Sequence, residues 1–142
     1  MAEDLFQGSD AAPKAPLAPQ TRVKLHDETA IYASVVELSR FIARVTSDFR
    51  RDIKPTYGVI LVDGTARMAV LVREANIARD EAKLPVLDEI LRQLEYIQFT
   101  LKVLRDLGSR WLSNKAYEAS IPLTASIGRQ AHALKNHFAP AP

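Results

Sequence analysis

The side chains best suited to chemistry in this sequence are three histidines, and their spacing does not suit a metal site. His26 stands alone, and His132 and His137 lie five residues apart near the end of the chain. Residues that share a helix face lie three or four positions apart, so these two imidazoles do not converge on one ion. No Cys occurs, which excludes thiolate metal sites, disulfides and a cysteine nucleophile.

Catalytic motifs are also missing from the sequence. It contains no Glu-x-x-His pair of the di-iron bundles, no phosphate-binding glycine loop and no nucleophile elbow. Carboxylates do not occur in pairs at otherwise apolar positions, where an acid–base pair would be expected. We therefore predict a protein that is not an enzyme and that has no catalytic residue, metal or cofactor.

The remaining chemistry is that of positive charge. The net charge is only +2, from 19 basic and 17 acidic residues, which is well below that of a purely electrostatic nucleic-acid binder. Two groups of cations nevertheless fall in segments that an antiparallel bundle brings to one end. These groups are Arg50, Arg51 and Lys54, and Lys102, Arg105, Arg110 and Lys115. We predict that they contact the phosphates of RNA, although such a cluster is more often only a solvated surface.

The elements that must position these cations are four amphipathic helices. Residues 87–107 carry an apolar residue every three or four positions, which predicts one helix with a buried face. The members of that face are Leu87, Ile90, Leu94, Ile97, Leu101 and Leu104. Further helices are predicted at residues 28–53, 56–79 and 114–137. The predicted fold class is therefore all-α, an antiparallel up-down-up-down four-helix bundle.

Capping and breaking residues set the predicted helix ends. Asp27 is the expected N-cap of the first helix, and Pro55 is suited to the first turn of the second. Gly108 is expected to end the third helix in a left-handed conformation, and Ser113 is expected to cap the fourth. Pro122, inside the fourth helix, predicts a kink.

Residues 58–64 allow a second interpretation, because GVILVDG could be a buried strand followed by a turn. No second strand exists to pair with it, so we favour a helix. Inside that helix Gly64 would cost about 1 kcal/mol relative to Ala. A close approach of a second helix at Gly64 would explain the glycine.

The rest of the chain predicts where the bundle begins and in which compartment it works. We predict a disordered tail at residues 1–25, the bundle at 26–138 and a frayed C-terminus at 139–142. No apolar run approaches the roughly 18 to 20 residues that span a bilayer, and Glu3 and Asp4 stand where a secretory signal is basic. With no Cys, these features predict a cytoplasmic protein without a membrane partner.

Several short segments, in this order, make the chain from the first to the fourth predicted helix resemble a family of small four-helix bundles. The segments are Phe49-Arg50-Arg51-Asp52 with Tyr57-Gly58, Ala75-Asn76-Ile77-Ala78, Leu104-Arg105-Asp106-Leu107-Gly108, Leu112-Ser113 with Lys115 and Tyr117-Glu118, and Ile127-Gly128-Arg129. The family includes the Avd accessory proteins of diversity-generating retroelements and the proteins encoded in ribosomal-RNA intervening sequences.

The resemblance implies a homopentameric ring that binds a reverse transcriptase and RNA or DNA and supports mutagenic cDNA synthesis without catalysis of its own. It implies that basic residues of the third helix matter, at Lys102 and Arg105, and it adds Arg129 to the candidate binding residues. Five copies of a chain of charge +2 carry about +10 together, which suits an RNA partner. The alternative is a structural or protein-interaction bundle, like the intervening-sequence relatives, with no nucleic-acid role.

Overall fold

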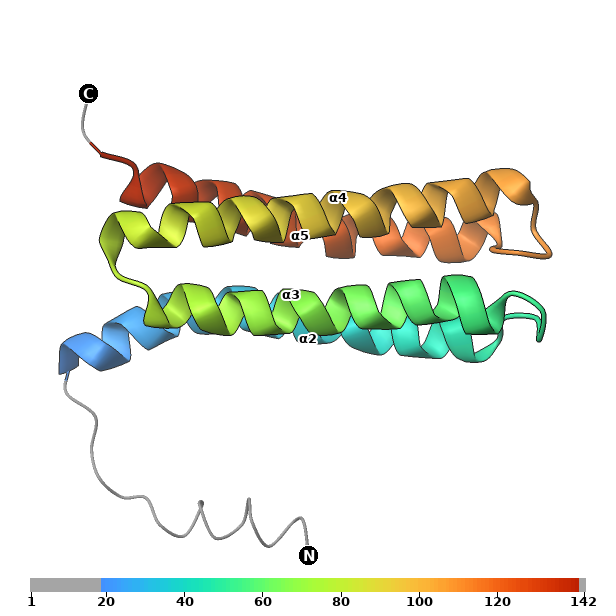
Figure 1. Cartoon of the computed structure of the whole chain (residues 1–142), viewed down its shortest axis with the longest axis horizontal. Coiled ribbons are helices and arrows are strands. Elements are labelled where there is room, and N and C mark those ends of the chain that lie inside the picture. Colours follow the sequence, from blue (N-terminus) through green and yellow to red (C-terminus); the bar gives the residue numbers. More distant parts are fainter. Residues whose placement is uncertain (1–18, 141–142) are drawn as a thin grey trace, which may run out of the picture.

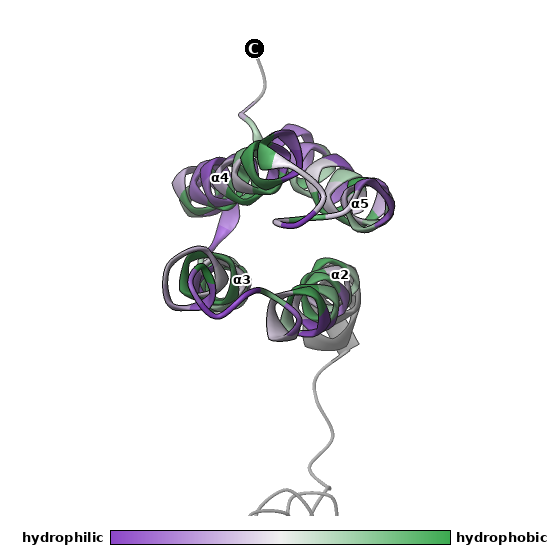
Figure 2. Ribbon diagram, turned by 90° about the vertical axis from the view of Figure 1, so that its right-hand side faces the viewer, coloured by the Kyte–Doolittle hydropathy of each residue, from purple (hydrophilic) through white to green (hydrophobic). Residues whose placement is uncertain are grey.

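The protein is an elongated, all-α bundle of four long helices, described here by a computed structural model of residues 19–140. Successive helices run in opposite directions along the bundle (Figure 1). Each helix packs against two others, in the order α2, α3, α4, α5 and back to α2. Viewed along its axis, the bundle has one helix at each of four corners (Figure 2). The predicted four-helix, up-and-down architecture is confirmed.

The first helix, α2 (Pro19–Ser47), begins and ends earlier than predicted. The expected start near residue 28 was wrong, and Asp27 lies within the helix rather than at its N-cap. Proline is tolerated in a first helical turn because the amide it lacks would be unpaired there. Residues 1–18 of the predicted tail, and 141 and 142 of the predicted frayed end, lie outside the described residues.

The chain then leaves the helix in a turn rather than continuing to residue 53. Amides of Asp48 and Phe49 donate to carbonyls three residues back, at 3.1 Å each, which tightens the end of α2. Phe49 and Ile53 are both buried, so the apolar spacing persists although the helix does not. A short π-helical segment, η1 (Lys54–Gly58), with Pro55 in its first turn, leads into α3 (Val59–Ile77).

The contact between α3 and α4 is close at Gly64, as the sequence predicted. A β-carbon at this glycine would lie 3.1 Å from Cγ1 of Ile97 and 3.2 Å from Nε2 of Gln93. The segment that could have been a strand is helical. Gly64 therefore lets α3 approach α4 more closely than any larger residue would.

A 3₁₀ turn, η2 (Asp80–Ala82), connects α3 to α4 (Lys83–Leu107). All six apolar residues predicted for the inner face of α4 are buried, at 4% exposure or less. Lys83 is buried as well, and its ammonium donates to the carbonyl of Ala75 and lies 5.3 Å from the ring centroid of Phe138. This lysine joins the last turn of α3 to the end of α5.

The connection from α4 to α5 (Asn114–Phe138) follows the predicted residues with one difference. Gly108 ends α4 with φ 129° and ψ 162°, which is an extended conformation reserved for glycine and not the predicted left-handed helical one. The Ser113 hydroxyl accepts the amide of Ala116 at 3.0 Å, which confirms the predicted N-cap. Pro122 lies inside α5, and the kink there remains a prediction.

Candidate nucleic-acid interface

Two connections that are far apart in sequence meet at one end of the bundle. The turn between α2 and α3 and the loop between α4 and α5 both lie at the end opposite Pro19 (Figure 1). Cζ of Arg50 lies 5.9 Å from the ring centroid of Trp111, and the ring of Tyr57 meets the same indole edge to face at 6.4 Å. The convergence of the two predicted groups of cations is therefore observed. We call this end, with its seven predicted cations, the basic end.

Aromatic rings hold two of the arginines in place. Arg50 lies over Trp111, and Cζ of Arg105 on α4 lies 4.4 Å from the ring centroid of Tyr117 on α5. A guanidinium over the face of an aromatic ring is attracted by the ring quadrupole and keeps its remaining donors free. Trp111 and Tyr117 were not among the predicted site residues, because only the tertiary fold brings their rings beside these arginines.

Carboxylates offset part of the charge at the basic end. Arg50 pairs with Asp52 at 2.9 Å, and Asp106 accepts from both Lys102 at 3.1 Å and Arg105 at 2.9 Å. Hydrogen bonds from Lys102 and Arg105 lower the pKa of Asp106 below its ordinary value. These side chains are 31% to 58% exposed, so the pairs are weak and a phosphate can displace the carboxylate.

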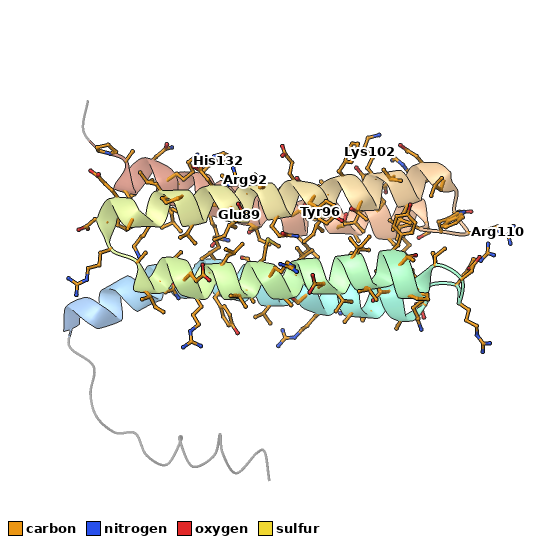
Figure 3. The ribbon with its side chains drawn as sticks, in the orientation of Figure 1. Glu89, Arg92, Tyr96, Lys102, Arg110 and His132 are labelled. Atoms are coloured by element: carbon orange, nitrogen blue, oxygen red, sulfur yellow. The ribbon has the colours of Figure 1, made fainter. Side chains whose placement is uncertain are left out.

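Four cations at the basic end are available to bind an external ligand. Among the side chains of residues 30–140, no acidic partner lies within ion-pair distance of Arg51, Lys54, Arg110 or Lys115. All four are exposed, and Figure 3 shows Arg110 projecting beyond the end of the bundle. These residues are the best placed to contact phosphate groups.

Arg129, the eighth candidate, does not join the others. It is exposed on α5, fifteen residues after Asn114. At 1.5 Å of rise per residue it lies roughly 22 Å along the helix from the basic end. A ligand would have to extend along the side of the bundle to reach it.

Metal-binding clusters and membrane-spanning helices are absent from the part of the chain that the structure describes. The side chains of residues 30–140 include no group of three His, Asp or Glu placed to hold a metal ion. None of the helices described is both long and apolar enough to cross a membrane. Every buried side-chain nitrogen or oxygen atom in the described region has a hydrogen-bond partner.

Comparisons with known proteins gave no relative: no protein family, no curated protein and no solved structure matches the chain significantly. The resemblance to the Avd and intervening-sequence bundles therefore rests on the short segments quoted above.

Proposed function

We propose that this protein is a non-enzymatic accessory protein that binds RNA or DNA through the basic end of its bundle. The contact between Arg50 and Trp111 carries the proposal, because it joins two loops whose cations would otherwise be separate clusters. Arg51, Lys54, Arg110 and Lys115 then present four positive charges within one small region. Such a group is suited to the phosphate backbone and gives little discrimination between bases.

The finer part of the proposal follows the resemblance to Avd proteins. The nucleic acid and a reverse transcriptase would be bound by a homopentameric ring of these bundles in a diversity-generating retroelement. A ring supports the proposal electrostatically, because five parallel copies would align five basic ends on one rim. Co-purification with a reverse transcriptase encoded beside the gene tests this part, and a gene with no such neighbour would count against it.

Binding to nucleic acid is tested by removing the four unpaired cations together. We expect Arg51→Ala, Lys54→Ala, Arg110→Ala and Lys115→Ala, combined in one variant, to weaken binding to labelled RNA and DNA at low salt. Each lost phosphate contact also flattens the dependence of log K on log salt by about 0.7 to 1. Trp111 is the only tryptophan, so its fluorescence reports binding at this end directly.

The matched control removes the same charge elsewhere. Arg40, Arg73, Arg79 and Arg92 are exposed and lie away from the basic end. Their combined replacement by Ala lowers the net charge equally, so only the position of the charge differs between the two variants. Equal loss of affinity in both would refute a local site, and an unchanged affinity in the first would refute the proposal.

A specific observation favours the alternative, a protein-interaction bundle without nucleic acid. The outer face of α3 carries four exposed aliphatic residues, at exposures of 46% to 69%: Val59, Val62, Val70 and Ile77. A helix that is apolar on both faces is usually covered on both. Absence of RNA and DNA binding at low salt, where electrostatic attraction is greatest, would favour this function.

A further inference from the structure

A hollow between α4 and α5 starts beside the basic end and runs along the side of the bundle. Its volume is about 370 Å³, which is within the range of sites that bind small ligands. The residues that line it are Glu95, Gln98, Phe99 and Lys102 on α4, and Tyr117, Ser120, Ile121, Thr124 and Ala125 on α5. Three of the α5 residues are small, and they leave a space that longer side chains would fill.

Two residues belong both to the hollow and to the basic end. Lys102 is one of the seven predicted cations, and Tyr117 carries the guanidinium of Arg105 over its ring. Figure 3 shows Lys102 on α4 toward the end of the bundle from which Arg110 projects. A strand whose phosphates lie on the basic end can therefore place an adjoining nucleotide in the hollow.

The middle of the hollow carries a phenyl ring that faces the solvent. Phe99 is 67% exposed, more than any other Phe, Tyr or Trp side chain of residues 30–140. Among the same side chains, no aromatic ring or cation stacks on it. Lys102 follows three residues later, about 4.5 Å along the helix. An exposed ring this close to a cation can stack an unpaired base while the cation contacts the neighbouring phosphate.

The polar groups beside the ring suit the edge of a base. Gln98 presents an amide, and Glu95 presents a carboxylate that accepts hydrogen bonds. Among the side chains of residues 30–140, neither has a hydrogen-bond partner. Glu95 lies seven residues before Lys102, or about 10 Å along α4, so the acid is separated from the phosphate position. A carboxylate and an amide recognise bases that carry an exocyclic amino group, such as cytosine and adenine.

We propose that this hollow binds an unpaired base, so that the ligand of the basic end is single-stranded RNA or DNA. The inference rests on the proposed function, because it names the class of nucleic acid that binds there. The base stacks on Phe99, and Lys102 exchanges the exposed carboxylate of Asp106 for a phosphate. In a duplex each base is stacked and paired within the helix, so none is free to enter the hollow.

Replacement of the ring tests the stacking. Phe99→Ala should weaken binding of a short labelled single strand by about fivefold or more, which is the effect of losing one base–aromatic stack. Phe99→Tyr should retain the affinity, whereas Phe99→Leu, which keeps apolar surface without a ring, should lose it. Binding of a blunt duplex should be the same in all these variants. The matched control Tyr32→Ala removes an exposed ring on α2 and should leave both affinities unchanged.

An abasic strand with the same number of phosphates provides the second measurement. The wild type should bind it only as tightly as Phe99→Ala binds the intact strand, and Phe99→Ala should not weaken it further, because both changes remove the same contact. Circular dichroism checks that each variant is folded.

The possible results separate this inference from the proposed function. An unchanged affinity in Phe99→Ala, an equal loss for single strand and duplex, or an abasic strand that binds as tightly as the intact one would each overturn the inference alone. A changed mass of Phe99→Ala in sedimentation velocity would assign the ring to a contact between copies and would overturn it as well. Absence of binding by the wild type at low salt would overturn both.

Discussion

Two glycines inside helices offer a direct test of how closely α3 and α4 pack. Gly64 and Gly128 both occupy helix interiors, where replacing glycine by alanine gains about 1 kcal/mol of helix stability. Their surroundings differ. A β-carbon at Gly64 would lie 3.1 Å from Cγ1 of the fully buried Ile97, whereas one at Gly128 would lie 3.5 Å from Cδ2 of Leu94, an ordinary contact.

The same substitution should therefore have different effects on stability at the two positions. At Gly128 the gain of about 1 kcal/mol is kept. At Gly64 either α3 or Ile97 must move by a few tenths of an ångström, and overpacking a core costs about 1 to 3 kcal/mol. We expect Gly128→Ala to stabilise the protein and Gly64→Ala to be neutral or to destabilise it by up to about 2 kcal/mol. The variants should differ by about 1 to 3 kcal/mol, or several degrees in Tm.

Urea denaturation followed by circular dichroism and by Trp111 fluorescence measures both changes. The experiment should be run at one low protein concentration, because self-association would add to the apparent stability. An unchanged slope of unfolding free energy against urea would show that the difference is in stability itself. If Gly64→Ala gains as much as Gly128→Ala, the close approach of α3 to α4 is refuted.

Two further predictions concern the basic end. Ser113→Ala removes the cap of α5 and should destabilise the protein by about 1 kcal/mol in urea denaturation, whereas Ser109→Ala in the same loop should have little effect. Lys102 and Arg105 lower the pKa of Asp106, so their pairing contributes stability above the ordinary carboxyl pKa that is lost as pH falls through the lowered value. Asp106→Asn should accordingly reduce the acid sensitivity of unfolding, and an NMR titration of the Asp106 carboxyl that shows an ordinary pKa would contradict this.

The sequence predicted the helices well where the buried apolar residues belong to a regular helix, and less well where buried residues lie in a turn. Every apolar residue predicted on the inner face of α4 is buried, because an uninterrupted helix converts spacing directly into a face. Phe49 and Ile53 continue the apolar spacing of α2 and are also buried, but they belong to the turn that follows the helix. The spacing of apolar residues indicates which side chains are buried, but it does not indicate which backbone hydrogen bonds form.

The arrangement at the basic end was predictable only in outline. An antiparallel bundle must bring alternate connections together, so the meeting of Arg50 with the loop of Trp111 followed from topology. The contacts of these cations with carboxylates and aromatic rings were harder to predict. The spacing of four residues between Lys102 and Asp106 signals an ion pair. The ring beneath Arg50 comes from the α4–α5 loop and the ring beneath Arg105 comes from α5, so neither contact leaves a signal in the local sequence.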